Sequence, residues 1–177
     1  MVISNPNIKI KKVFLAGPIQ GAPDWHEKMM EELKDENIII ASPKRAKDKN
    51  FNYDEQVDWE TNNLESADII IFYLAKEKDE IPGRSYAQTS RFEIGENLAR
   101  IHYCKTNQKV IVYGEEGFFG LSYLKLKIES DKYHDFASYY SNREEFLKAL
   151  KDEIKKIKEE GNLWNLLPIH ILVVKEF

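Results

Sequence analysis

The sequence has little cysteine and no long hydrophobic run, and each absence excludes a class of protein. Cys104 is the single cysteine in 177 residues, so an internal disulfide or a cysteine-based zinc site cannot form. The longest apolar run, residues 69–75, is too short to cross a bilayer. Residues 1–12 show no apolar core of a signal peptide. We therefore expect a cytoplasmic protein with no membrane partner.

The chain also lacks a strong excess of either charge. It contains 26 Lys and Arg against 30 Asp and Glu, a formal net charge of −4. A mildly acidic chain lacks the positive field that attracts nucleic acid polymers, so a small polar ligand is the better expectation. With 42% hydrophobic residues, 8 Gly and 6 Pro, the composition is globular and not disordered. The length predicts one domain over residues 1–177.

Short apolar segments alternate with segments of helical periodicity along the chain. Ser141 and Glu144 have the spacing of a capping box at the start of the last long helix. The apolar stretch within residues 161–177 is interpreted as a C-terminal extension that packs on the domain or on a partner. The expected strands are residues 12–17, 38–41, 68–74, 109–113 and, near the end, 133–138; the expected helices are residues 24–36, 54–66, 91–103 and the segment after Ser141.

This alternation predicts an α/β fold, a doubly wound parallel sheet of about five strands with helices on both faces. In such sheets ligands bind beyond the carboxyl ends of the strands, near the point where the strand order reverses. This rule points to the turn after Gly17, the loop after Leu74 and the turn after Tyr113.

The common catalytic motifs are missing. The sequence has no GxxxxGK[ST] phosphate loop, no GxGxxG fingerprint and no GxSxG elbow. Its four histidines do not have metal-ligand spacing, so we expect neither a metal nor a cofactor. Carboxylates near the ends of the expected strands remain as candidates.

Glu93 is the first of these, and two interpretations of it are open. It stands three residues after Ser90, which fits a structural capping box at a helix start. The same position fits a catalytic carboxylate, because the first turn of a helix keeps such a group ionised and fixed.

Glu60 is the second candidate. Alone it fits a solvated glutamate on the helix before the third expected strand. Together with Glu93 it fits the division of labour in glycosyl transfer, in which one carboxylate is the nucleophile and the other is the acid near the leaving group.

Four segments of the chain form a recognisable series. They are, in order, Val13–Ile19, Trp59–Glu60 with Leu64 and Ala67–Ile71, Arg91–Gly95, and Lys109–Gly114. This series resembles the nucleoside 2-deoxyribosyltransferase family, which includes the deoxynucleotide N-hydrolases, from residue 13 to about residue 125. The resemblance implies a flavodoxin-like sheet and cleavage or transfer of the N-glycosidic bond of a 2′-deoxynucleoside or deoxynucleotide.

The resemblance also assigns catalytic roles. Glu93 matches the nucleophile that forms a covalent glycosyl-enzyme intermediate, so that configuration is retained. Glu60 stands where the family usually has an aspartate that protonates the departing base. Phe14 stands where many members have a tyrosine that hydrogen-bonds the nucleophile, and Ala87 replaces an acid found in some members.

Other polar residues are candidates for substrate binding. Gln88, Thr89 and Ser90 could contact sugar hydroxyls or could be polar groups of a helix start. The family often takes a polar residue from a neighbouring subunit, and Ser122 is the nearest match, although it also fits a loop or cap serine. We therefore expect a homo-oligomer. The first expected strand-to-helix turn adds Gly17, Pro18 and Gln20, with turn formation as their alternative role.

Several functional alternatives stay open at this stage. The resemblance does not separate a transferase from a hydrolase, or a nucleoside from a nucleotide substrate. A nucleotide-binding or sensing module of the same fold without turnover is the alternative from another class. An oligomerisation or scaffold role, built on the apolar C-terminal stretch, is a third.

Overall fold

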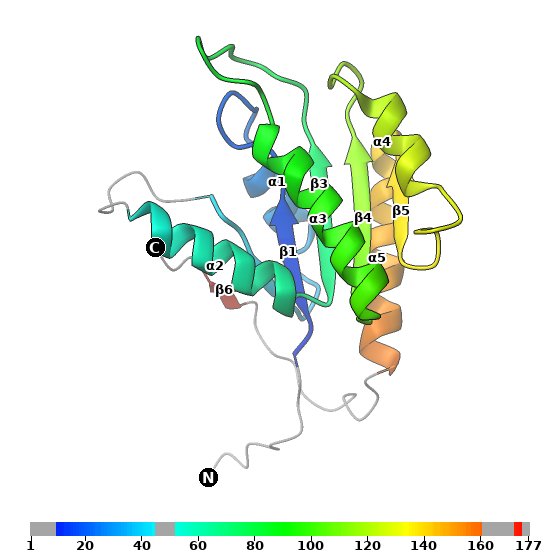
Figure 1. The fold of residues 1–177 in the computed structure, drawn as a ribbon. Helices are drawn as coiled ribbons and strands as arrows, with labels where there is room; N and C mark the ends of the chain where they lie inside the picture. Colours follow the sequence, from blue (N-terminus) through cyan, green and yellow to red (C-terminus); the bar gives the residue numbers. More distant parts are fainter. Residues whose placement is uncertain (1–9, 45–51, 161–171, 175–177) are drawn as a thin grey trace.

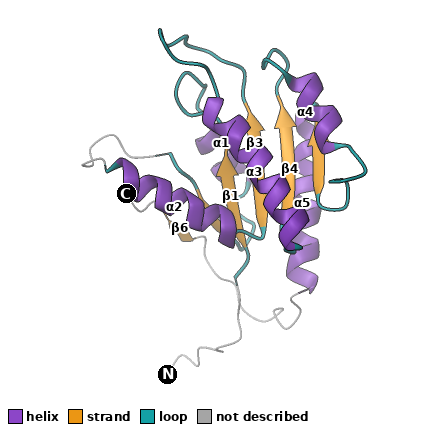
Figure 2. Ribbon diagram, in the orientation of Figure 1, coloured by secondary structure: helices purple, strands orange, loops and turns teal. Residues whose placement is uncertain are grey.

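The computed structural model of the protein describes residues 10–44, 52–160 and 172–174 (Figure 1). Helices and strands alternate throughout (Figure 2). The strands are β1 (Lys12–Ala16), β2 (Ile39–Ala41), β3 (Ile69–Leu74), β4 (Lys109–Gly114), β5 (Ala137–Tyr140) and β6 (Leu172–Val174); the helices are α1 (Trp25–Glu32), α2 (Tyr53–Ser66), α3 (Gln88–Cys104), α4 (Leu121–Ile128) and α5 (Arg143–Glu160).

The strands form one parallel sheet in the order β5-β4-β3-β1-β2-β6. The order of the first five strands is that of a flavodoxin-like sheet, which reverses between β1 and β3. Continuous apolar runs such as Ile69–Leu74, buried at every residue, are typical of strands covered on both faces. The predicted α/β fold is confirmed.

Helices cover both faces of this sheet. Helices α1 and α5 lie on one face, where Trp25, Met29 and Phe146 belong to one buried cluster. Helices α2, α3 and α4 lie on the other, in front of the strands in Figure 1, where Leu64 and Ile94 belong to a second cluster. The pocket described below is lined by α2 and α3, which pack on the second cluster. Helices α1 and α5 contribute no described lining residue and support the sheet from the other face.

Several details differ from the expectations, among them a sixth strand, β6, at the edge of the sheet. Strand β5 begins at Ala137 because the residues before it form turns, with the amide of Phe136 donating to the carbonyl of Tyr133 at 3.1 Å. The expected Ser141 capping box is wrong, since the Asn142 side chain accepts from the amides of the first turn of α5. Helix α4 was not expected.

The apolar extension, residues 161–177, lies outside the described residues except for β6.

The described helices show no membrane-crossing candidate. None of them is both long enough and apolar enough to span a bilayer.

Candidate active site

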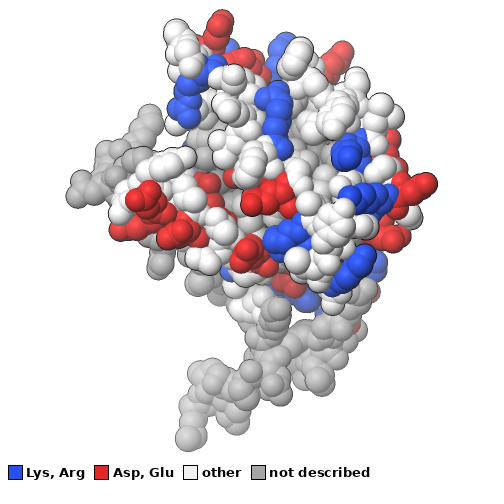
Figure 3. Space-filling view, in the orientation of Figure 1, with Lys and Arg blue, Asp and Glu red and all other residues white. Residues whose placement is uncertain are grey.

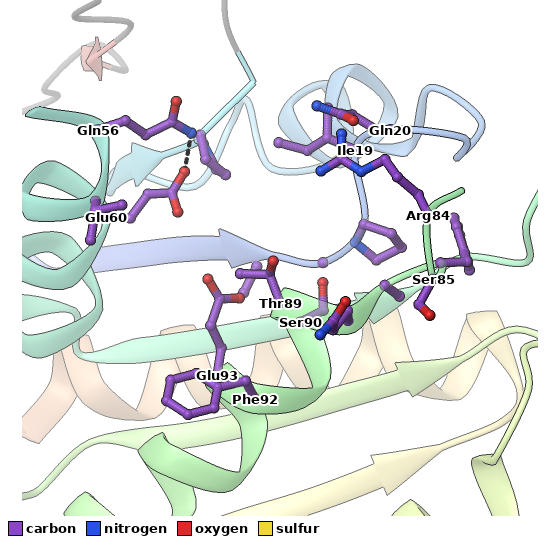
Figure 4. A pocket seen from close by; sticks show the side chains of 18 of the residues that line it. Ile19, Gln20, Gln56, Glu60, Arg84, Ser85, Thr89, Ser90, Phe92 and Glu93 are labelled. Atoms are coloured by element: carbon purple, nitrogen blue, oxygen red, sulfur yellow. Dashed lines mark hydrogen bonds between the residues drawn. The ribbon is translucent and has the colours of Figure 1, made fainter. Parts of the chain in front are cut away.

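A pocket of about 560 Å³ opens beyond the carboxyl ends of β1 and β3, between α2 and α3. This is where the strand order reverses and where ligands of such sheets bind. Its lining comes from the turn after β1, from α2, from the loop between β3 and α3, and from the start of α3 (Figure 4). The volume is within the usual range of small-molecule sites.

The pocket brings together most of the residues selected from the sequence. It is lined by Glu60, Glu93, Gly17, Pro18, Gln20, Gln88, Thr89 and Ser90. Of the three segments expected at the site, the turn after Gly17 and the loop after Leu74 line this pocket, whereas the turn after Tyr113 contributes no described lining residue. Ser122 lies exposed on α4, outside the pocket of its own chain.

Packing on the opposite face of the sheet fixes the turn after β1. Gly17 has a φ of +149°, and a Cβ there would lie 2.4 Å from the carbonyl oxygen of Tyr73 and 2.8 Å from the Trp25 ring. Only glycine fits such a conformation and approach. The buried Pro18 offers its carbonyl to the indole N–H of Trp25 at 2.8 Å. Both pocket residues therefore have a structural role as well.

The start of α3 differs from the expected capping box. Helix α3 begins at Gln88, and its N-cap residue, Ala87, is in the left-handed conformation with no side-chain cap. Ser90 is therefore inside the first turn, where it is buried at the pocket wall. The capping-box interpretation of Ser90 and Glu93 is wrong, and Glu93 belongs to the second turn, beyond the strongest field of the helix end.

The environment of Glu93 keeps its carboxyl group protonated at neutral pH. Burial is the largest cause, followed by the charges of Glu60 and Glu96, and together they raise the pKa of Glu93 to about 8. Among the described residues none donates a hydrogen bond to this carboxylate, and the buried Phe14 has no hydroxyl to do so. The sequence led us to expect an ionised carboxylate at Glu93, whereas its raised pKa favours the protonated form.

Glu60 approaches Glu93 from the opposite wall of the pocket. It projects from α2, and both side chains extend into the same cavity (Figure 4). Gln56, one helical turn earlier, donates a hydrogen bond from its side-chain amide to Glu60. The charge of Glu60 is one of the causes of the raised pKa of Glu93, so the two side chains interact across the cavity.

The lining is acidic overall. Four glutamates contribute to it, namely Glu60, Glu77, Glu93 and Glu96, whereas Arg84 is the one basic side chain among the described lining residues. Acidic side chains also gather along the helices beside this hollow (Figure 3). Arg91 lies outside the pocket, because its guanidinium binds the carbonyl oxygens of Tyr86 and Phe119. The pocket therefore favours a developing positive charge.

Sequence reasoning missed the apolar mouth of the pocket. Tyr53 and Val57 on α2, Ile19 after β1 and Phe92 on α3 are exposed and line it. A flat apolar ring, such as a nucleobase, could pack between these walls. The signal was helical spacing, because residues 53, 57 and 60 share one face of the helix that carries Glu60.

The raised pKa of Glu93 predicts a pH-dependent stability. Above pH 4.5 the unfolded chain loses this proton, whereas the folded chain keeps it until about pH 8, so stability falls as pH rises through this range. Glu93→Gln removes the effect. We expect the free energy of unfolding of the variant to match the wild type near pH 4 and to exceed it by about 1–3 kcal/mol above pH 8.

Urea unfolding across this pH range measures the difference. Glu65→Gln, an exposed carboxylate of α2 outside the pocket, is the control and should give no pH-dependent gain. A constant difference between Glu93→Gln and wild type at all pH values would contradict the prediction.

Within the described residues no group of three or more His, Cys, Asp or Glu side chains could hold a metal ion.

A comparison with protein families identifies the family of the chain. No curated protein matches the chain. The family model described as nucleoside 2-deoxyribosyltransferase like matches residues 10–118, which includes Glu60 and Glu93. Because this match spans more than half of the 177 residues, the chain belongs to the nucleoside 2-deoxyribosyltransferase-like family.

Proposed function

We propose that this protein cleaves or transfers the N-glycosidic bond of a 2′-deoxynucleoside or deoxynucleotide through a covalent intermediate on Glu93. The observation that carries the proposal is the pair of carboxyl groups, Glu93 from α3 and Glu60 from α2, in one pocket at the switch point of the sheet (Figure 4). Membership of the family supports a nucleoside as the substrate class.

In the first half of the reaction, a carboxylate oxygen of Glu93 attacks C1′ of the deoxyribose. The bond between C1′ and the base nitrogen breaks as the ester bond to Glu93 forms. Glu60 supplies the proton that the departing base requires. This is the division of labour between two carboxyl groups in retaining glycosyl transfer.

In the second half, water or a second base attacks C1′ from the face that the first base has left. Glu60, now ionised, accepts the proton of the attacking group, and the ester bond to Glu93 breaks. Two inversions at C1′ give net retention, and both carboxyl groups return to their initial states.

The proton shared by the two glutamates must change its position during this cycle. The raised pKa of Glu93 keeps a proton on Glu93, whereas attack requires an ionised Glu93 and a protonated Glu60. Positive charge develops on the sugar ring in the transition state, and it stabilises the Glu93 carboxylate in a pocket lined by glutamates. The developing charge on the sugar thus favours an ionised Glu93 and a protonated Glu60, which is the state that attack requires.

The remaining lining residues supply contacts for the substrate. Gln88, Thr89 and Ser90 place hydroxyl, amide and uncapped backbone N–H groups at the start of α3, and we assign them to the sugar hydroxyls or a 5′ substituent. We assign Gln20, which lines the pocket after β1, to the base. Ser122, which is exposed on α4, can contact a substrate only in the pocket of a second copy, so its role requires the homo-oligomer.

Intact-protein mass spectrometry tests the proposal directly. After rapid quenching, we expect a sugar-sized adduct with deoxynucleosides, or a sugar-phosphate adduct with deoxynucleotides, located on Glu93 by peptide mapping. Glu93→Gln should carry no adduct. Base release without any adduct at the shortest quench times, or an adduct on another residue, would overturn the covalent mechanism.

A labelled free base separates transfer from hydrolysis. The wild type is incubated with an unlabelled deoxynucleoside and the labelled base. Label incorporation into the nucleoside identifies a transferase, because the second base has reached the intermediate. Release of the first base without incorporation identifies a hydrolase.

One observation favours the alternative of a binding or sensing module without turnover. A carboxyl group with a pKa of about 8 is mostly protonated at neutral pH, and a protonated carboxyl is a poor nucleophile. Saturable binding of a nucleoside or nucleotide, with no base release across a panel of both classes, would select this alternative.

A further inference from the structure

Helix α2, which carries Glu60, buries few of its side chains. Of its 14 residues, all of them described, only Leu64 is buried. Among the described residues, Trp59 adds a partly buried ring 6.1 Å from the ring of Phe14. Because packing of an apolar face normally fixes a helix, polar contacts gain weight in holding a helix that buries so little.

Polar side chains from neighbouring elements hold the C-terminal end of α2. The side-chain amide of Gln108 donates to the carbonyl oxygens of Leu64 at 2.9 Å and of Ala67 at 2.6 Å. The guanidinium of Arg100 donates to the same Leu64 carbonyl at 3.3 Å. The last carbonyls of a helix have no partner within the helix, so these donors complete the end of α2.

The same side chains continue to the backbone of Glu93. Arg100 donates to the side-chain oxygens of Gln108 at 2.6 Å and of Asn97 at 2.8 Å. Asn97 in turn donates to the main-chain carbonyl of Glu93 at 2.9 Å. Asn97 and Gln108 are 2% and 7% exposed, so water competes little for these bonds and they hold their geometry well.

We propose that Gln108, Arg100 and Asn97 form a bridge that positions the helix of Glu60 relative to the helix of Glu93. These three are positioning residues, since none of them lines the pocket. The proposal rests on the proposed function, in which the separation of the two carboxyl groups matters for catalysis. Misplacement of a catalytic group by about 1 Å can cost ~100-fold in rate.

The charge environment of Glu93 provides a reporter of this separation. Glu60 on α2 and Glu96 on α3 both raise its pKa, while Glu77 and Arg84 line the pocket from the loop before α3. Of these groups, Glu60 is the one whose helix the bridge holds. If α2 moves outward or becomes mobile, the repulsion from Glu60 weakens and the pKa of Glu93 falls.

Arg100→Met tests the bridge, because it removes the three hydrogen bonds of the guanidinium, to the Leu64 carbonyl and to the side chains of Gln108 and Asn97. We expect the pKa of Glu93, measured by carboxyl ¹³C NMR on substrate-free protein, to fall by about one pH unit or more. We expect kcat to fall at least about 10-fold and KM to change less than about 3-fold. Arg100→Lys keeps the charge but reaches fewer acceptors, so it should lie between Arg100→Met and the wild type.

Control variants separate positioning from a general loss of stability. Ile154→Val and Ile154→Ala shorten a buried residue of α5, on the opposite face of the sheet, and are chosen to match the unfolding temperature of the Arg100 variant. They should leave the pKa of Glu93 and kcat unchanged. If Arg100→Met does not fold, the comparison is made with Arg100→Lys.

The two readouts distinguish failure of the bridge from failure of the proposed function. An unchanged pKa of Glu93 in a folded Arg100 variant, or a loss of kcat no larger than in the α5 controls, overturns the bridge. A lowered pKa in a protein that releases no base from any nucleoside or nucleotide supports the bridge and removes the proposed function.

Discussion

Glu93→Ala is expected to lower the rate of base release by at least about 10⁴-fold while the protein stays folded. The size of the effect follows from the proposed mechanism, in which no other group can form the ester to C1′. Glu60 is on the opposite wall (Figure 4), and in this mechanism it transfers the proton. Removal of the nucleophile therefore leaves only the uncatalysed departure of the base in a shaped pocket.

The measurement combines an assay of base release with binding and folding controls. Circular dichroism and the unfolding temperature establish that the variant is folded. Glu65→Ala removes an exposed carboxylate of α2 that does not line the pocket, and it should keep full activity. Normal turnover by a folded Glu93→Ala protein would remove Glu93 as the nucleophile.

The second large effect concerns pH and the proton shared by Glu60 and Glu93. The proposed reaction needs one proton on the pair, and burial together with the charge of Glu60 raises the pKa of Glu93 to about 8. Above this pH the pair loses its last proton, so no proton remains for the departing base. We expect kcat/KM to fall as the pH rises above about 8, with a slope of −1.

Glu60→Gln should change both the rate and the shape of this profile. Loss of a general acid typically costs 10²–10⁴-fold, so kcat should fall by about that factor. Without the charge of Glu60 the pKa of Glu93 should also fall. The decline above pH 8 should then disappear, because the remaining carboxyl group acts in its ionised form.

A substrate with a better leaving group gives the matching control. A nucleoside whose base departs without protonation should restore most of the rate in Glu60→Gln and none in Glu93→Ala. A wild-type rate that rises through pH 8 would contradict the assignment, since it would mean that the pair acts without its proton.

Much of the fold could be predicted because its strands are short, continuous apolar runs. Residues 69–74 are buried at every position, and such runs indicate a sheet covered on both faces without any tertiary information. The position of the pocket followed from the same pattern, since parallel strands end at one edge. The candidate residues selected near Gly17 and Glu93 therefore proved to share one cavity.

Local signals failed where two patterns competed. Tyr133 and Phe136 are aromatic, which suggested a strand, but their backbones form turns and their rings pack against each other at 5.9 Å. Ser90 and Ser141 both had capping-box spacing. A left-handed Ala87 starts α3 earlier, and Asn142 caps α5 in place of Ser141, because asparagine is as good a cap as serine.

The protonation of Glu93 could not be predicted from the sequence. Its nearest expected influence was the start of its own helix, which favours the ionised form. The influence that decides its pKa, apart from burial, is the charge of Glu60, which comes from a different helix across the cavity. The electrostatic effect of one carboxylate on another depends on the distance between the two helices that carry them. The spacing of residues along the sequence does not give this distance.

Gly17 has a consequence for how the binding specificity of this protein can change in evolution. Any side chain at this position would collide with the Tyr73 backbone and the Trp25 ring, so selection cannot reshape the wall after β1 without rebuilding the core beneath it. The exposed residues Tyr53, Val57 and Phe92 carry no such constraint. Among related sequences, we therefore expect substitutions to concentrate on α2 and the mouth of the pocket. The wall formed by the turn after β1 should stay invariant.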